Sequence, residues 1–328
     1  MTTALQQKTS KVQPGSGERL VVNRVDEDIA IVILNWNQYE DTAECLTSLR
    51  RVHHPAFRTV MVDNGSTDGS PEKLQKEFPE LNVIRNQENL GYVGGNNIGI
   101  SFALETEAQY ILLLNNDTVV DPEFLSELLS VARRNCDAGI IGARVVYHDR
   151  PEVLWALGGN LQQPFGRIKM LGRDKSSRIT KWDKKDFDHV PGAVMLVRAA
   201  VFRQVGGLDP DFFLNWEDAE FCLRAKKGGW RVIVAPGSLV RHKVSKATAG
   251  RLATYFGQRN RLLFARKTLP KWQFFCVLVP YHWLRLAALV VSNAVQFRFD
   301  LVKAAILGTI DFFRGRLGKG SMARVQRF

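Results

Sequence analysis

The sequence predicts an α/β fold with a mostly parallel sheet flanked by helices, followed by a basic helical region. Two observations predict the sheet: short apolar runs alternate with segments of helical spacing, and each run ends in polar residues. A third observation sets the C-terminal part aside. Residues 241–328 carry 17 Lys or Arg against only Asp300 and Asp311, whereas the first 240 residues hold 28 basic and 31 acidic residues.

The first two strands are expected near the N-terminus. The run IAIVILNWN (29–37) is read as a strand, and a helix with Ala43, Leu46 and Leu49 at helical spacing follows it. The segment RTVMVDNGSTDGS (58–70) indicates a second strand and a Gly/Ser/Asp loop. Ser70-Pro71-Glu72 then has the composition of a helix start.

Two further strands follow in the same pattern. NVIRN (82–86) is a short strand, and GYVGGNNIGISFALE (91–105) is a Gly-rich turn that runs into a helix. QYILLLNND (109–117) is the fourth strand, and Asp121-Pro122-Glu123 starts the next helix. Because parallel strands end at one edge of a sheet, their polar ends are expected to gather there.

The pattern loosens after residue 150. Residues 158–190 are polar and basic without clear periodicity, and we expect a mobile loop over the crevice. AVMLVRAAVF (193–202) and WRVIVAPGSLV (230–240) supply further strands. Between them, the spacing of Ala219, Phe221, Cys222 and Ala225 puts Glu217 and Asp218 in the first turn of a helix.

The end of the fourth strand can be interpreted in two ways. In LLLNNDTVV (112–120) the apolar run stops at Asn115, Asn116 and Asp117. Asn and Asp favour turns through local backbone bonding. Polar side chains at a strand's carboxyl end also project into the crevice where α/β sheets bind ligands.

Two other strand ends offer groups for a nucleotide. A carboxylate at Asp63 can accept the imide N–H of a uracil or thymine ring, and capping of a turn is an equally good explanation for it. Glycines 91, 94 and 95 permit close approach of the backbone to a ligand, and the helix that follows offers free N–H groups to a phosphate.

Metal-binding and basic groups follow later in the chain. Asp117 is a hard oxygen ligand for Mg²⁺ or Mn²⁺, and His242 in VRHKVS ends a strand where an imidazole can complete a Mn²⁺ site. A lone histidine in that place is more often structural. The Trp216-Glu217-Asp218 segment supplies paired carboxylates, one of which can act as a general base.

These segments together resemble a known family. The order ILNWN, VDNGSTDGS, NLGYVGGNN, LLLNNDTVVDPEFL, GGLDPDFFLNWEDAEFCLRA and RH is similar to glycosyltransferases of family 2, most of all to bacterial rhamnosyltransferases and galactofuranosyltransferases. Each segment is weak evidence alone, and the combination, which covers about residues 29–260, is specific. The resemblance implies the GT-A fold, a Rossmann-like sheet that binds a nucleotide-sugar at its strand ends.

The resemblance also implies roles for individual residues. The nucleotide-sugar would be held by residues at the strand ends, with Asp63 on the pyrimidine and the others on the rest of the nucleotide, its diphosphate and the sugar: Asn35, Asp63, Asn89, Gly94, Gly95, Asn96, Asn115, Asn116 and Trp216. Trp216 would stack on a sugar, with ordinary core packing as the alternative.

The catalytic and metal groups follow by the same resemblance. Asp218 would be the catalytic base and Glu217 would orient the acceptor or the base. Asn115-Asn116-Asp117 stands where the family has its D-x-D motif, so Asp117 would bind Mg²⁺ or Mn²⁺. In related galactofuranosyltransferases a histidine 24 residues beyond the base binds the metal, and His242 has this spacing. Asn115 departs from the motif, so the metal has fewer carboxylates here.

The implied reaction is an inverting sugar transfer in bacterial surface-polysaccharide synthesis. We expect a dTDP- or UDP-linked donor, dTDP-rhamnose first and UDP-galactofuranose second, and a glycan or polyprenyl-linked acceptor. A nucleotidyltransferase also uses nucleotide crevices and carboxylate-bound Mg²⁺, and a non-catalytic membrane-docking protein is the alternative outside enzymes. The Trp-Glu-Asp segment and the step to His242 favour sugar transfer.

The basic tail and the N-terminus set the expected organisation. We expect a disordered leader over 1–28 without a signal peptide, a catalytic domain over 29–260 and a helical basic region over 261–328. Four scattered cysteines without a C-x-x-C pair argue against a disulfide framework or zinc site and suit a reducing compartment.

Tail charge of this kind fits either nucleic acid or an anionic membrane surface. Residues 274–297 are nearly apolar but contain Pro280, His282 and Arg285, and residues 301–320 mix apolar residues with Lys303, Arg314 and Arg316. An arginine within a membrane span is costly, and core helices need no such excess of cations. We therefore expect a cytoplasmic protein bound peripherally to the inner face of the membrane, with no nucleic-acid partner; a pair of core helices is the alternative.

Overall fold

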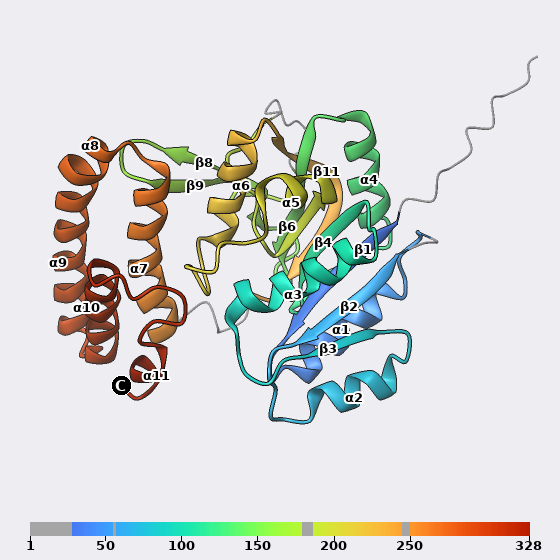
Figure 1. Ribbon diagram of the computed structural model, residues 1–328, viewed down its shortest axis with the longest axis horizontal. Coiled ribbons are helices and arrows are strands. Elements are labelled where there is room, and N and C mark those ends of the chain that lie inside the picture. Colours follow the sequence, from blue (N-terminus) through green and yellow to red (C-terminus); the bar gives the residue numbers. More distant parts are fainter. Residues whose placement is uncertain (1–27, 55–56, 179–185, 245–249) are drawn as a thin grey trace, which may run out of the picture.

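The computed structural model describes residues 28–54, 57–178, 186–244 and 250–328. The leader expected over 1–28 therefore lies outside the described residues, apart from Asp28. Figure 1 shows an α/β body with a group of helices, α7 to α11, packed beside it.

A mixed sheet forms the centre of the α/β body. Its strand order is β3-β2-β1-β4-β10-β6-β11-β5, and β7 pairs with the end of β6 outside this order. The register pairs β1 with β2 and β4, β2 with β3, and β6 with β11 in parallel, whereas β10 runs antiparallel to both β4 and β6. The strands are β1 (Ile29–Asn35), β2 (Arg58–Asp63), β3 (Asn82–Arg85), β4 (Tyr110–Asn115), β5 (Thr118–Val120), β6 (Ala138–Tyr147), β7 (Leu154–Ala156), β10 (Val194–Arg198) and β11 (Arg231–His242).

The mostly parallel sheet confirms the expected fold class. Six strands point the same way, because β10 lies antiparallel between β4 and β6 and so leaves these two parallel to each other. β5 and β7 pair antiparallel with β11 and β6. β6 is a strand that the sequence did not indicate.

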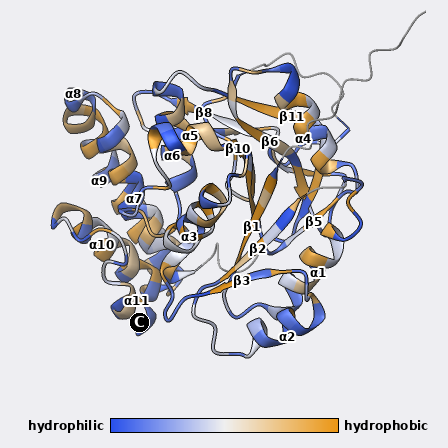
Figure 2. Cartoon of the chain, turned by 45° about the vertical axis from the view of Figure 1, so that its right-hand side comes forward, coloured by the Kyte–Doolittle hydropathy of each residue, from blue (hydrophilic) through white to orange (hydrophobic). Residues whose placement is uncertain are grey.

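Helices cover both faces of the sheet. Alternate β1 residues point to opposite sides: Ala30 and Val32 pack with α3, α6 and α7, whereas Ile29 and Ile31 pack with α1, α2 and α4. Burial on both faces explains the continuous apolar strands, which Figure 2 colours orange. The helices of the body are α1 (Tyr39–Leu49), α2 (Ser70–Glu77), α3 (Gly91–Glu105), α4 (Phe124–Arg134), α5 (Ala199–Val205) and α6 (Glu217–Lys227).

Two expected elements differ from the structure. The loop expected over 158–190 contains a two-stranded ribbon, β8 (Gly158–Gln162) and β9 (Arg167–Leu171), and residues 179–185 lie outside the described part. The strand expected over 193–202 ends at Arg198, and α5 begins at Ala199. The apolar run Ala-Ala-Val-Phe suits a strand or a helix equally, and burial of Val201 and Phe202 accommodates the helix.

The C-terminal helices pack onto the body rather than hanging from it. α7 (Arg251–Thr268) runs through the expected domain boundary at residue 260, and α10 (Phe299–Phe313) packs along it. Tyr255 and Phe256 of α7 are fully buried there. α11 (Met322–Gln326) returns to α7, and the chain ends close by, at the lower end of the group of helices in Figure 1.

One helix of this region is long and apolar enough to cross a membrane, judged by length and composition alone. It spans Lys271–Val295 with a mean hydropathy of 1.8 in its most apolar window, and comprises α8 (Lys271–Gln273), a π-helical segment (Phe274–Leu278) and α9 (Val279–Val295). Pro280 has no backbone N–H to donate to the preceding helical turn, and this missing hydrogen bond accounts for the irregular π segment just before it.

Much of this helix is exposed. Its large apolar side chains point outwards and form what we call the apolar face: Trp272, Phe275, Trp283, Leu284, Val291 and Val295.

Candidate active site

Two adjoining cavities open at the carboxyl ends of the parallel strands. The first has a volume of about 540 Å³ and the second about 430 Å³. Both values fall in the range of about 300–1,000 Å³ that is typical of small-molecule sites. Tyr92, Asn115, Leu214, Asn215 and His242 line both cavities, so a ligand in one can touch a ligand in the other.

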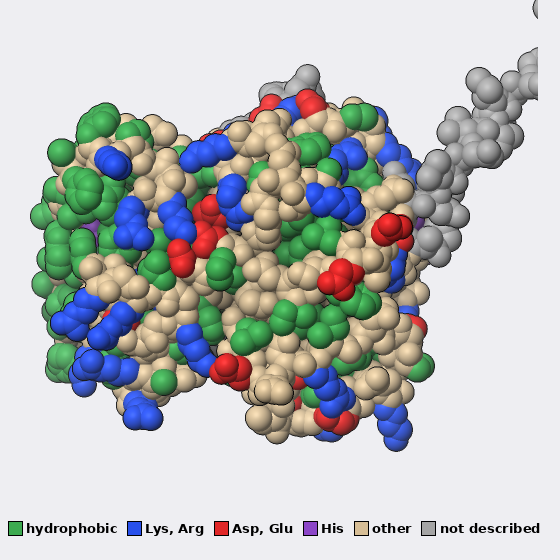
Figure 3. All heavy atoms as spheres, viewed as in Figure 1, with side chains coloured by type: hydrophobic (Ala, Val, Ile, Leu, Met, Phe, Trp, Pro, Cys, Tyr) green, Lys and Arg blue, Asp and Glu red, His purple; other side chains and the backbone are tan. Residues whose placement is uncertain are grey.

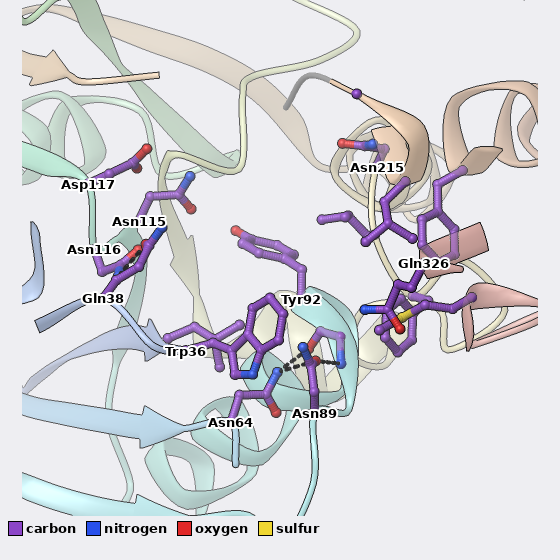
Figure 4. Close-up of a pocket in the computed structure, with 18 of the residues that line it drawn as sticks. Trp36, Gln38, Asn64, Asn89, Tyr92, Asn115, Asn116, Asp117, Asn215 and Gln326 are labelled. Carbon is purple, nitrogen blue, oxygen red and sulfur yellow. Dashed lines mark hydrogen bonds between the residues drawn. The ribbon is translucent and has the colours of Figure 1, made fainter. Parts of the chain in front are cut away.

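The turn between β4 and β5 forms one wall of the first cavity. Asn115, Asn116 and Asp117 all line it, and Figure 4 shows them facing open space opposite Trp36 and Tyr92. The Asn116 amide donates to Gln38 Oε1 at 3.0 Å and to Thr42 Oγ1 at 2.9 Å. The polar stop in LLLNNDTVV is therefore both a turn and part of a cavity wall.

Asp117 and His242 meet at this wall. β11 pairs with β5 so that His242 stands opposite Thr118, which brings His242 Nε2 to 3.0 Å from Asp117 Oδ1. The imidazole packs edge-on against the Trp155 ring at 4.4 Å, and its Nδ1 has no hydrogen-bond partner among the described residues. Both side chains are buried, His242 to 3% and Asp117 to 4% exposure.

The pair fits a divalent cation as two of its ligands. Adjacent ligands of an octahedral ion at about 2.1 Å lie about 3.0 Å apart, which is the separation of these two atoms. One imidazole nitrogen with one carboxylate oxygen suits Mn²⁺ at least as well as Mg²⁺. The described parts of the chain hold no group of three or more His, Cys, Asp or Glu that could bind a metal.

Asp218 lies in the wall of the second cavity and is held from several sides. Its Oδ1 accepts from the Ala219 amide at 2.8 Å and its Oδ2 from the Gly192 amide at 3.0 Å. His189 Nε2 lies 3.0 Å from Oδ2, an ion-pair distance, although the ring is not oriented for a hydrogen bond. Burial raises the pKa of Asp218, but His189 and the two amides outweigh burial and bring the pKa below its ordinary value.

The pKa of Glu217 is shifted in the opposite direction. Burial, and then the charge of Asp218, raise the pKa of Glu217 well above its usual value, and its Oε2 has no hydrogen-bond partner among the described residues. Two neighbouring carboxyl groups with pKa values pushed apart are typical of a site where one is ionised and the other is neutral. The geometry therefore favours Asp218 as the ionised group.

The loop before α6 is strained and firmly held. Phe213, Asn215 and Trp216 adopt φ of 66°, 69° and 76°, a region that costs non-glycine residues roughly 1–3 kcal/mol each. The buried Asn260 amide compensates, since it lies within 3.0 Å of the carbonyls of Phe212, Leu214 and Asn215. Trp216 lines the second cavity and also packs on Phe264, with 5.0 Å between the ring centres.

Asn35 and Asp63 form a buried network instead of a cavity wall. Asn35 Nδ2 donates to Asp63 Oδ1 at 2.9 Å and to Ser70 Oγ at 2.9 Å, and neither residue lines a described cavity. Ser66 donates its hydroxyl to Asp63 Oδ1 at 2.6 Å and its amide to Oδ2 at 3.0 Å. The structure thus favours the turn-capping role for Asp63 over a direct contact with a pyrimidine.

The Gly-rich segment likewise has residues at the cavity and residues away from it. Asn89 lines the first cavity, where its Oδ1 accepts from Asn64 at 3.0 Å and from the Gly91 amide at 2.8 Å. Gly94, Gly95 and Asn96 lie within α3 and line neither cavity. A Cβ on Gly95 would stand 2.2 Å from Leu34 Cδ1, so this glycine lets α3 pack closely on the sheet.

Several cavity residues were not expected from the sequence. Trp36, Gln38 and Asn64 join the first cavity from strand ends, and Met322, Val325 and Gln326 close it from the C-terminal helix. Tyr92 joins both cavities and donates to the Gly192 carbonyl at 2.9 Å. The sequence pointed to His189 as a cavity residue only through its position, just before the strand that contains Val194.

Comparison with known proteins identifies the family. Residues 27–265 match the family described as glycosyltransferase like family 2. The chain belongs to this family. The match spans both cavities except for the part that α11 contributes.

Three relatives that the chain matches over most of their length are named as glycosyltransferases, at low identity. The chain is 26% identical to the low-salt glycan biosynthesis hexosyltransferase Agl10 of Haloferax volcanii, covering 89% of this chain and 93% of the relative. It is 22% identical to an N-acetylglucosaminyl-diphospho-decaprenol L-rhamnosyltransferase of Mycobacterium tuberculosis, with 83% and 94% covered. It is 23% identical to the dTDP-rhamnosyl transferase RfbF of Shigella flexneri, with 90% and 99% covered.

The expected resemblance to rhamnosyltransferases and galactofuranosyltransferases is confirmed, because a galactofuranosyltransferase matches as well. Among solved structures, the mannosyltransferase PcManGT of Pyrobaculum calidifontis in complex with GDP-Man and Mn²⁺ superposes with a TM-score of 0.55 at 14% identity, covering 87% of this chain and 86% of that one. This similarity supports the GT-A fold of the family.

Proposed function

We propose that this family member is an inverting glycosyltransferase that moves a sugar from a nucleotide-sugar to an acceptor hydroxyl. The observation that carries the proposal is the position of Asp218, whose pKa lies below its ordinary value, at a cavity that adjoins the one lined by Asp117. Tyr92 links the two, because it lines both cavities, the first with Asp117 and the second with Asp218. Burial, and then neighbouring carboxyl groups, raise the pKa of its phenol.

Each of the two cavities binds one of the two substrates. The donor occupies the first cavity, with its diphosphate towards Asp117, and the acceptor occupies the second, with one hydroxyl towards Asp218. Asp218 accepts the hydroxyl proton as the oxygen bonds to the anomeric carbon, and the bond from that carbon to the nucleoside diphosphate breaks with its electron pair. Attack opposite to the leaving group inverts the anomeric configuration and needs no covalent enzyme intermediate.

Asp117 and His242 are the residues that would hold Mg²⁺ or Mn²⁺. Such an ion supplies charge that stabilises a departing diphosphate. Asn115, in the first D-x-D position, adds no charge to the pair. The donor diphosphate then contributes a large share of the metal's ligands.

For the donor we propose dTDP-rhamnose, with UDP-galactofuranose as the second candidate. Two relatives are named as rhamnosyltransferases, one of them with a dTDP-linked donor, and another as a galactofuranosyltransferase. Trp36 is 41% exposed at the cavity mouth and offers a face on which a pyrimidine ring can stack. A polyprenyl-diphosphate-linked acceptor is proposed from the relative that acts on a diphospho-decaprenol.

The test of this proposal is nucleotide release from a panel of donors. The purified protein is mixed with dTDP-rhamnose, UDP-galactofuranose or GDP-mannose and with a lipid-diphosphate-linked acceptor. Acceptor-dependent release of dTDP or UDP supports sugar transfer. Release of a sugar 1-phosphate would indicate a nucleotidyltransferase, because that enzyme takes the nucleotidyl group from the donor. Release of neither product with any donor would refute an enzyme of either kind.

We also propose that the protein attaches peripherally to the inner face of the membrane through the apolar face. Figure 3 shows hydrophobic side chains gathered along the edge formed by α8 and α9, with Lys and Arg close by. Apolar side chains lie in the interface while cations meet anionic lipid, each worth about 1 kcal/mol near the surface.

The attachment is tested with full-length protein, because α11 also lines the first cavity. Replacement of Trp283 and Leu284, which are 51% and 73% exposed, by Ser should shift the protein from the membrane to the soluble fraction. Salt should release the unchanged protein as well. Release only by detergent would instead show that residues 271–295 are inserted.

A further inference from the structure

Three arginines meet where the β8–β9 ribbon contacts α7 and α9. Arg261 of α7 is 6% exposed, whereas Arg167 at the start of β9 and Arg285 of α9 are exposed. The guanidinium groups of Arg261 and Arg285 lie 5.3 Å and 5.9 Å from the centre of the same Tyr281 ring. Two like charges thus share one aromatic side chain.

Among the described residues, no carboxylate balances these charges. Arg167, Arg261 and Arg285 form no ion pair with an acidic side chain of the described residues. Arg261 Nη2 donates to the Phe165 carbonyl at 3.1 Å, and its buried Nε has no partner there. A buried, uncompensated cation is costly unless a partner is supplied.

The pKa values of Arg261 and His282 reflect the same excess of positive charge. Burial and then Arg285 lower the pKa of Arg261 to about 10, and Arg167 acts in the same direction. Burial and then Arg261 and Arg285 lower the pKa of His282 to about 4. Arg259, also in α7, provides a contrast, because it is fully buried but donates to the Phe212 carbonyl and to Asn260.

The cluster lies between the second cavity and the apolar face. Gly257, which lines the second cavity, precedes Arg261 by one helical turn, a rise of about 6 Å. Ile168, the neighbour of Arg167, lines the same cavity. On the other side, Arg285 directly follows Trp283 and Leu284 of the apolar face.

We propose that Arg167, Arg261 and Arg285 bind the diphosphate of a lipid-linked acceptor. The acceptor sugar then enters the second cavity towards Asp218, and the hydrocarbon chain lies along the apolar face. Guanidinium groups bind phosphate oxygens with two parallel hydrogen bonds, and several of them neutralise a diphosphate. The proposal rests on the function proposed above and adds the residues that hold the acceptor's diphosphate.

Anionic phospholipid headgroups share this phosphate chemistry. The acceptor is favoured over a bulk lipid as the ligand, because the arginines adjoin residues that line the second cavity, where Asp218 lies. A bulk lipid headgroup gains nothing from a position beside this cavity. The two sources separate when a soluble lipid diphosphate and a vesicle are tested side by side.

The experiment uses the full-length protein and farnesyl diphosphate as the probe, with farnesol as its phosphate-free counterpart. Arg167→Gln and Arg285→Gln replace exposed side chains and so leave the fold intact, and Arg298→Gln removes an exposed charge of the same tail outside the cluster. Each cluster variant should bind farnesyl diphosphate about 10-fold more weakly, the loss typical of one charge-assisted hydrogen bond. Farnesol binding and the Arg298→Gln variant should not change.

In the transfer assay the cluster variants should raise KM for the diphosphate-linked acceptor, with kcat and donor KM within twofold of the parent protein. Unchanged binding of farnesyl diphosphate in both cluster variants would overturn the proposal. So would a loss confined to phosphatidylglycerol vesicles, which would assign the arginines to bulk headgroups. Arginine-dependent probe binding in a protein that transfers no sugar would refute the proposed function and leave the diphosphate site standing.

Discussion

Replacement of Asp218 by Asn is expected to abolish sugar transfer while the donor still binds. The side chain keeps its shape, but an amide cannot accept a proton from the acceptor hydroxyl. Loss of a positioned base typically lowers the rate by about 10²–10⁴-fold. The donor site should be spared, because Asp218 lines only the second cavity.

The structure also sets the cost of this change in stability. Asp218 accepts from two backbone amides, one on each carboxylate oxygen, and an Asn can accept only on one side. One amide then faces an NH₂ group, at a cost of about 1–3 kcal/mol. The effect on folding is therefore moderate, and a folded variant can be assayed.

The assay compares kcat by nucleotide release with donor affinity by titration, and measures the melting temperature of the variant. Glu220→Gln is a matched control, because Glu220 lies on the same helix and pairs with Arg224 away from both cavities. Turnover near that of the parent protein in a folded Asp218→Asn variant would refute the assignment of the base.

Three further predictions follow from the same geometry. Asp117→Ala and His242→Ala should each raise the Mn²⁺ concentration needed for half-maximal activity, and full activity of the parent protein in EDTA would contradict a metal site. Because the folded-state pKa of Glu217 lies above its unfolded value, the native state binds the extra proton, and stability should fall as pH rises from the unfolded towards the folded pKa. Glu217→Gln should remove this loss of stability. The melting temperature of the variant minus that of the parent protein should therefore be larger at pH 8 than at pH 5. An equal difference at the two pH values would show that Glu217 is ionised in the folded protein. Asn260→Ala should cost about 2–4 kcal/mol in unfolding by urea, since the partly buried carbonyls of Leu214 and Asn215 lose this donor, and should lower kcat as well. Unchanged kcat in that variant would mean that the strained loop does not position α6.

The sheet could be read from the sequence because burial on both faces leaves a clear pattern. The runs that became β1 and β4 are apolar at nearly every position, β2 has an apolar Val-Met-Val centre, and all three end in Asn or Asp. Residues 158–171 lacked such a pattern, since the ribbon they form is exposed on much of its surface and its strands alternate only weakly.

The site was only partly accessible to sequence reasoning for a related reason. A polar residue at a strand end faces a ligand or stabilises its own turn, and residue type does not separate the two. Asp117 and Asp63 have the same kind of position, yet Asp117 lines a cavity and Asp63 holds Ser66 and Asn35. His189 and Gln326 reach the cavities through contacts between distant segments, which no local pattern records.

The anomeric configuration of the product tests the central claim most directly. The protein is incubated with the donor that supports nucleotide release and with its lipid-linked acceptor, and the new linkage is examined by NMR. Direct attack by a hydroxyl deprotonated by Asp218 predicts a configuration opposite to that of the donor. A product with the donor's configuration would contradict the account.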